Sequence, residues 1–190
     1  MPMMTLQGYL AGQLLIAMPQ MRDPRFARSV VYLCAHTAEG AMGIVVNRLF
    51  DGLSFSELLA QLDIDPTPDC DKIRVHFGGP VEGGRGFVLH SADYMHETSL
   101  MVAEGVALTA TVDVLKAIAE GDGPRKCLLA LGYAGWSPGQ LDSEIRENAW
   151  LNVPADEKLL FDANLDDKWE AAIHKLGIAS GSLSAEVGHA

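Results

Sequence analysis

Short apolar runs along the chain predict strands, because they are rich in branched and aromatic residues and are bounded by turn residues. The runs at 29–36 and 42–47 are joined through Glu39-Gly40, a short connection that predicts an antiparallel hairpin. The other predicted strands lie at 13–17, 72–77, 86–90, 126–131, 149–153 and 159–161, with one or two short strands within 100–108.

Four segments instead have the spacing of an amphipathic helix. The first, 54–62, begins with Ser54 and Glu57, which together make a capping box. The others are 111–120, which ends at Gly121, and 137–148 and 165–176. Hairpins mixed with helices, without strict alternation, predict an α+β domain with a mixed, mostly antiparallel sheet.

The composition predicts a single globular domain. The chain has 190 residues, 48% of them hydrophobic, which is enough for a core without disulfide or metal support. We expect the domain to cover residues 1–178. The small and polar residues 179–190 are expected to form a loosely ordered tail.

The charge argues against two classes of partner. With 14 basic and 25 acidic residues the net charge is −11, which disfavours direct binding to nucleic acid or to anionic membranes. Arg22, Arg25 and Arg28 recur in one stretch, but Asp23 interrupts them and a solvated loop explains them. No basic segment precedes the apolar residues 9–18 and no apolar run reaches membrane length, so we expect a cytoplasmic protein.

Cysteine and histidine give no firm metal or disulfide pattern. Three widely spaced cysteines do not form a disulfide framework, and Cys34 and Cys127 lie in apolar runs typical of a core. A metal site assembled from His90, Asp93 and His96 remains an alternative. We expect no cofactor and no metal.

Residues 135–139 match the nucleophile motif G-x-S-x-G, with Ser137 at its centre. In that motif the residue after the serine donates a backbone N–H to the oxyanion, but here it is Pro138, which has none. A helix start with Ser137 as N-cap and Gln140 completing a capping box is the better interpretation.

The glycine-rich stretch 78–86 permits two interpretations. It is most simply a hairpin link with positive φ angles. Its amides, helped by Arg85, are an alternative anion-binding site, although the stretch lacks the lysine and hydroxyl of a phosphate-binding loop.

Four long segments, 12–36, 40–48, 78–91 and 131–151, together with the ending 188–190, resemble the AlgH/YqgE family. The resemblance implies an α+β fold whose branched sheet curls toward a pseudo-barrel, with flanking helices. It also implies a bacterial cytosolic protein with a link to the regulation of alginate production. It carries over no catalytic residues.

We therefore predict a cytosolic regulatory or binding module for a protein or small-molecule partner, with no catalytic residues. Polar, glycine and aromatic residues at predicted strand ends are the candidates for one shared binding surface. They are Asn47, Arg48, Gly78, Gly79, Pro80, Arg85, Tyr133 and Trp136. One alternative is an enzyme with a site near the glycine-rich loop, using Arg48, His90 or Asp93. The other is a DNA-binding transcriptional regulator, which the acidity disfavours.

Overall fold

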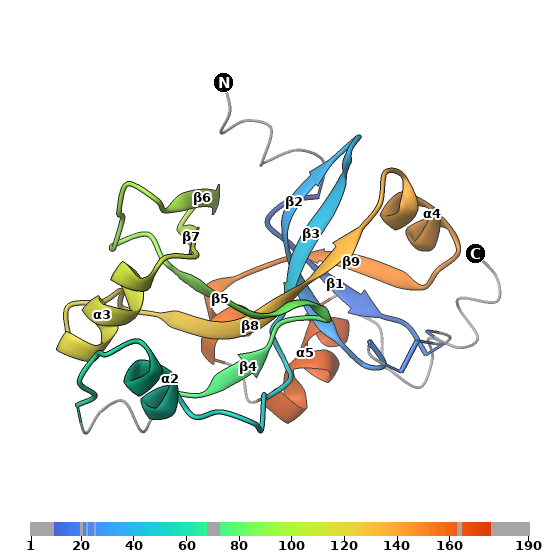
Figure 1. Cartoon of the computed structure of the whole chain (residues 1–190). Helices are drawn as coiled ribbons and strands as arrows, with labels where there is room; N and C mark the ends of the chain where they lie inside the picture. The colour runs from blue at the N-terminus through green and yellow to red at the C-terminus, as the bar shows by residue number, and fades with distance from the viewer. Residues whose placement is uncertain are drawn as a thin grey trace.

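A computed structural model describes residues 10–19, 21, 23–24, 26–67, 73–162 and 165–175 of the chain. Within these residues nine strands form one curled sheet (Figure 1). In chain order they are β1 (Gln13–Ala17), β2 (Val30–Thr37), β3 (Gly40–Val45), β4 (Val75–Phe77), β5 (Val81–Ser91), β6 (Leu100–Ala103), β7 (Val106–Thr109), β8 (Cys127–Trp136) and β9 (Trp150–Pro154). Their order across the sheet is β6-β7-β5-β8-β3-β2-β1-β9, and β4 pairs with β8 beside this path.

The sheet branches at β8. One edge of β8 pairs with β5, while its other edge pairs with β4 near Leu129 and with β3 near Gly135. All pairings are antiparallel except that of β4 with β8. The predicted α+β class, with its mostly antiparallel and curled sheet, is confirmed.

Strand β2 shows why apolar runs without alternation predicted strands correctly. Val31 and Leu33 face one apolar cluster, which also holds Trp150, while Val30 and Tyr32 face the main core. Because successive side chains of a strand point to opposite faces, a strand with both faces covered has no polar side.

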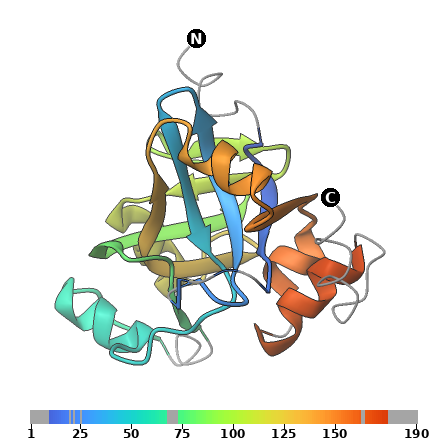
Figure 2. The ribbon, with the colours of Figure 1, turned by 90° about the vertical axis from the view of Figure 1, so that its right-hand side faces the viewer.

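Helices cover the sheet at three places (Figures 1 and 2). Phe55 of α2 and Val114 of α3 share an apolar cluster with Val75 of β4 and Leu129 of β8, while Trp169 of α5 joins the main core beside β1 and β2. Helix α4 follows β8. The helical elements are α2 (Phe55–Gln61), α3 (Val112–Glu120), α4 (Gln140–Arg146), the π-helix η2 (Lys158–Asp162), the 3-10 turn η3 (Leu165–Asp167) and α5 (Lys168–Lys175).

The helix ends follow local chemistry. Ser54 Oγ accepts from Glu57 N at 3.1 Å and Glu57 Oε1 accepts from Ser54 N at 3.3 Å, so the predicted capping box is present. Helix α3 ends at Gly121 with φ 85°, as predicted.

Two predicted elements were wrong. Residues 159–161 form part of η2 rather than a strand, because Asp156 accepts hydrogen bonds from the N–H groups of Leu159 and Leu160 and starts a helical turn. The helix predicted from Ser137 begins only at Gln140, because residues 137–140 form a turn in which Gln140 N–H donates to Ser137 O at 3.0 Å and Gly139, the N-cap, has a φ of 75°.

Some predictions lie outside the described residues, including the tail 179–190, Arg22 and Arg25. Among the residues that are described, no helix has both the length and the apolar character needed to cross a membrane.

Candidate functional site

The eight residues predicted to share one surface do not all lie together. Six of them line three different hollows, and Gly78 and Gly79 lie where the backbone before β5 packs against β8. Three are brought together, since Arg85, Tyr133 and Trp136 line one hollow, which we call the mouth groove. Asn47 and Arg48 line a second, the cationic pocket. The third, the tryptophan hollow, includes Pro80 and again Trp136. Gly78 and Gly79 line none of the three.

Gly78 and Gly79 allow two backbones to cross at van der Waals distance. A Cβ atom on Gly79, whose φ is +154°, would lie 2.1 Å from the carbonyl carbon of Tyr133. A Cβ on Gly78 would lie 2.3 Å from Gly132 O, and the Gly78 N–H already donates to Leu131 O at 2.8 Å. These glycines serve close packing, and their geometry gives no support to a phosphate cradle.

The rest of the glycine-rich stretch is a bulge in β5 rather than a hairpin link. Val81 is opposite Tyr133 and Gly86 is opposite Leu131, so the residues between them bulge out where β8 has only Gly132. Strands β4 and β5 lie on opposite edges of β8 and are not hairpin partners, which corrects the prediction.

Trp136 is held mainly as a structural residue. Glu144 Oε1 accepts from the indole N–H of both Trp136 and Trp150, each at 3.0 Å. The two rings pack edge to face with centroids 5.9 Å apart, and Trp136 keeps only 7% of its surface exposed.

Among the described residues, no histidine contacts the serine of the nucleophile motif. Ser137 Oγ donates to Gln140 Oε1 at 3.2 Å. The imidazole that reaches α4 belongs to His36, whose Nδ1 accepts from Leu10 N–H and whose Nε2 contacts Asp142 Oδ1 at 3.1 Å. Both nitrogens of that ring are thus engaged.

His90 and Asp93, candidates for the alternative enzyme and metal sites, are structural in the fold. The buried His90 hydrogen-bonds Ser91 O at 2.9 Å and Thr109 Oγ1 at 2.7 Å, and its burial lowers its pKa. A hydrogen bond from Ser91 and another from Arg125 N–H lower the pKa of Asp93. In the described part of the chain, no three His, Cys, Asp or Glu side chains gather as metal ligands.

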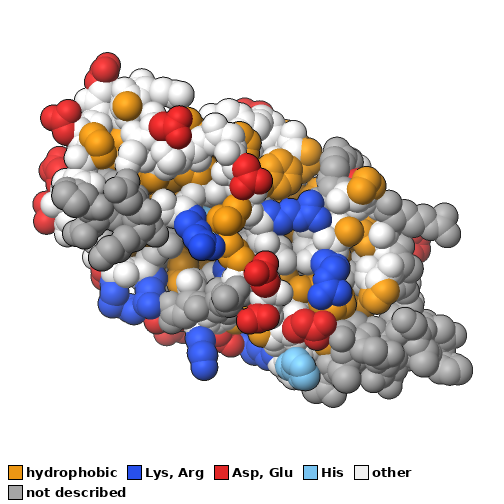
Figure 3. All heavy atoms as spheres, turned by 90° about the horizontal axis from the view of Figure 1, so that it is seen from below, with side chains coloured by type: hydrophobic (Ala, Val, Ile, Leu, Met, Phe, Trp, Pro, Cys, Tyr) orange, Lys and Arg blue, Asp and Glu red, His pale blue; other side chains and the backbone are white. Residues whose placement is uncertain are grey.

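The cationic pocket is the site with the most unusual chemistry. It has a volume of about 840 Å³ and is lined by the segment after β3, by β4, by β8 and by the residues from η2 to α5. The molecule seen from below carries Lys and Arg side chains beside acidic and apolar ones (Figure 3). The charged residues that line the pocket are Arg48, Asp51, Arg74, Asp166 and Lys168. With His76 neutral, the pocket lining therefore carries one positive charge in excess.

Lys168 places a buried ammonium in the wall of this pocket. Only 1% of its surface is exposed, and Nζ donates to Val46 O at 2.9 Å and to Leu160 O at 2.7 Å. Burying a charge is expensive unless polar atoms surround it, so these carbonyls fix the ammonium in position.

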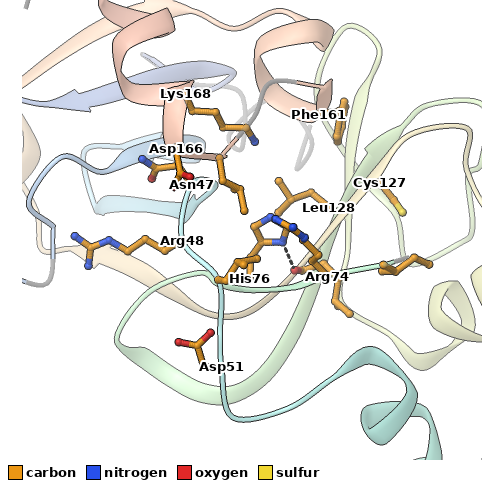
Figure 4. A pocket seen from close by; sticks show the side chains of 14 residues that line it. Asn47, Arg48, Asp51, Arg74, His76, Cys127, Leu128, Phe161, Asp166 and Lys168 are labelled. Atoms are coloured by element: carbon orange, nitrogen blue, oxygen red, sulfur yellow. Dashed lines mark hydrogen bonds between the residues drawn. The ribbon is translucent and has the colours of Figure 1, made fainter. Parts of the chain in front are cut away.

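His76 lies in the middle of the pocket, between Arg48 and Arg74 (Figure 4). Its Nδ1 donates to Leu129 O at 3.1 Å. Burial, and to a smaller degree the charge of Lys168, lowers its pKa to about 4, although the bond to Leu129 opposes this. The imidazole is therefore neutral near pH 7.

The two arginines differ in their contacts. Nη2 of Arg48 donates to Ala27 O at 2.6 Å, which directs this side chain to the outer rim. Arg74 is exposed just before β4 and forms no ion pair among the described residues. Asn47 is structural, because its side chain accepts from Val30 N–H and donates to Arg28 O, both at 2.9 Å.

An apolar wall completes the pocket and gives it a mixed character. It is formed by Ile73, Leu128, Leu129, Phe161 and Leu165. A ligand here would meet both charged groups and aliphatic or aromatic carbon.

Sequence reasoning missed Arg74, His76 and Lys168. His76 is a strand residue of β4 whose Nδ1 is hydrogen-bonded, and it also lines the pocket. A signal for Lys168 was present, since it falls on the apolar face of its helix with Trp169 and Ala172. A lysine at such a position must find buried partners.

Comparisons with known proteins agree with this fold. The sequence profile of a family described as AlgH-like matches residues 14–181. A UPF0301 protein of Rhodospirillum rubrum is 58% identical over 184 residues, which cover 97% of this chain and 96% of that protein. A UPF0301 protein from Rhodopseudomonas palustris strain HaA2 is 56% identical, and the match covers 96% of this chain and 87% of that protein.

Two solved structures are also similar. The solution structure of the AlgH protein from Pseudomonas aeruginosa has 46% identity and a TM-score of 0.79, covering 96% of this chain and 97% of that one. The crystal structure of protein DIP2367 from Corynebacterium diphtheriae has 20% identity and a TM-score of 0.71, covering 88% and 87%. The second likeness concerns the fold alone.

Proposed function

This chain belongs to the AlgH-like family, and we propose that it is a regulatory binding module whose cationic pocket takes a small anionic ligand. The observation that carries the proposal is the gathering of Arg48, Arg74 and Lys168 around one pocket of a chain with net charge −11. They come from three separate segments, so no single local feature explains their meeting.

The contacts give Lys168 and Arg74 distinct roles toward an anion. Lys168 is fixed by two carbonyls and supplies a charge that needs little reordering on binding. Arg74 is exposed and forms no ion pair among the described residues, so its guanidinium can bind a carboxylate or phosphate group with two N–H donors. His76 lies between the arginines and is neutral near pH 7. It therefore neither adds to nor cancels the positive charge of the pocket.

The apolar wall limits the ligand further. Phe161 and the leucines of the pocket favour an anion that carries a carbon skeleton over a bare inorganic ion. We do not favour direct DNA binding, because the pocket is a local exception in a strongly acidic chain. Cytoplasmic location and a role in gene regulation, such as of alginate production, belong to this proposal as expectations.

The test is calorimetric titration of the full chain with phosphate, pyrophosphate, citrate and benzoate. We expect saturable binding of at least one anion at one site per chain. Arg74→Gln should weaken it about five- to twentyfold, since a charge-assisted hydrogen bond is lost. Arg146→Gln, an equal change of charge on the exposed end of α4, is the matched control and should bind as the wild type does.

Two results would contradict the proposal. One is the absence of binding heat for all four anions. The other is equal weakening by Arg74→Gln and Arg146→Gln, which would show that net charge rather than this pocket governs binding. If an anion binds as expected, native mass spectrometry of protein purified gently from its own host can identify the natural ligand by its added mass.

A further inference from the structure

The mouth groove is a second hollow, which meets β8 at its end, whereas the cationic pocket meets β8 at its start. It has a volume of about 830 Å³ and is lined by residues of the β2–β3 hairpin, of β5, β6 and β7, and of the end of β8. The tip of the β6–β7 hairpin approaches the start of β1, where a Cβ on Gly12 would lie 2.8 Å from Ala103 Cβ. The curled sheet therefore nearly closes there, and the mouth groove lies between the hairpins that line it.

The walls of this groove are apolar. They include Met42, Phe87, Leu100, Leu108 and Tyr133, and among the described lining residues only Glu39 and Arg85 carry charge. Leu100 keeps 43% of its surface exposed although it lies in a concave site. The volume falls within the range of about 300–1,000 Å³ in which proteins hold drug-sized ligands, and barrel mouths are a common place for them.

Arg85 gives the groove one anchored positive charge. Its guanidinium lies 5.1 Å from the ring centroid of Phe87, which forms part of the apolar wall. Its ion pair with Glu82 is 3.9 Å long and both side chains are about half exposed, so the pair is weak. An anionic group that takes the place of Glu82 can pair with Arg85 and accept the hydrogen bond that Tyr133 gives to Glu82.

We propose that the mouth groove binds an anionic amphiphile, a molecule with one apolar body and one acidic head. The body would lie on Phe87 and Leu100, and the head would pair with Arg85. The site shares no lining residue with the cationic pocket and does not depend on the proposed function of that pocket.

The experiment uses two dyes with the same ring system at pH 7. Anilinonaphthalene sulfonate carries an acidic head, and N-phenyl-1-naphthylamine lacks it. Fluorescence titration of the full chain should show one saturable site for both dyes. Arg85→Gln should weaken the sulfonate dye about five- to tenfold and leave the neutral dye unchanged, because only the sulfonate meets the guanidinium.

Leu100→Gln should weaken both dyes about three- to tenfold, because it removes apolar contact area. Leu62→Gln, at the end of α2, removes a leucine of similar exposure outside the groove and should change neither. Arg146→Gln is the control for charge.

Saturable binding with this pattern supports the proposal, provided that each variant unfolds cooperatively. Three results would overturn it: no saturable binding of the sulfonate dye, equal effects of Leu100→Gln and Leu62→Gln, or an Arg85→Gln effect on both dyes alike.

Discussion

His76 makes the stability of this protein depend on pH in a defined direction. Burial lowers the pKa of the folded imidazole from 6.5 to about 4, while the unfolded chain keeps the ordinary value. Between these values the unfolded state binds a proton that the folded state does not. The neutral imidazole therefore makes its full contribution to the free energy of unfolding above pH 6.5, and this contribution is lost as the pH falls toward 4. The gap of about 2.5 pH units corresponds to a loss on the order of 3 kcal/mol in the free energy of unfolding.

Urea unfolding at pH 7.5 and pH 4.5 measures this loss. His90 also has a lowered pKa and contributes in the same direction, so the His76 share must be isolated by substitution. In His76→Asn the amide N–H can still donate to Leu129 O, but the titrating group is gone. We expect the stability difference between the two pH values to shrink by about 2–3 kcal/mol in this variant.

His174→Asn makes the same exchange at an exposed position of α5 and serves as the control. If the wild type and His76→Asn lose equal stability on acidification, the reasoning about the buried imidazole is refuted.

Three further predictions concern the packing. Gly79→Ala should lower the free energy of unfolding by more than about 4 kcal/mol or prevent folding, because a methyl group there meets the backbone of β8. Gly83→Ala, which has open space around it, is the control and should change the melting temperature little. Tyr32→Phe should change the free energy of unfolding by less than about 0.5 kcal/mol, because the buried hydroxyl has no hydrogen-bond partner among the described residues; a larger loss would reveal a bound water. Glu144→Ala should lose about 1–3 kcal/mol in urea unfolding followed by tryptophan fluorescence, because two indole N–H groups lose their shared acceptor; no loss would show that water replaces it.

Local features of this fold could be predicted from the sequence where the signal was itself local. The run around Tyr32 predicted a strand, and Ser54 with Glu57 predicted a helix start, because each depends on neighbours in the chain. The parallel pairing of Val75 with Leu129 has no such signal, since it joins strands that are far apart in the sequence. That pairing creates the branch of the sheet.

The candidate site was predicted in part for the same reason. Arg48 was selected because it follows a predicted strand, and it does line the cationic pocket. Lys168 was not selected, because its role depends on the carbonyls of Val46 and Leu160, whose positions only the tertiary structure fixes. The role of the selected residues in binding remains a prediction.

The pairing of β1 with β9 has a consequence for biosynthesis. Leu14 pairs with Val153, so within the described part of the chain the outer edge of β1 is covered by β9, which lies more than 130 residues later. While the ribosome is still making the intervening residues, β1 presents an open strand edge that is rich in apolar side chains. Contacts between such distant segments also form slowly. A nascent chain that stalls before Trp150 is therefore expected to aggregate or to engage chaperones.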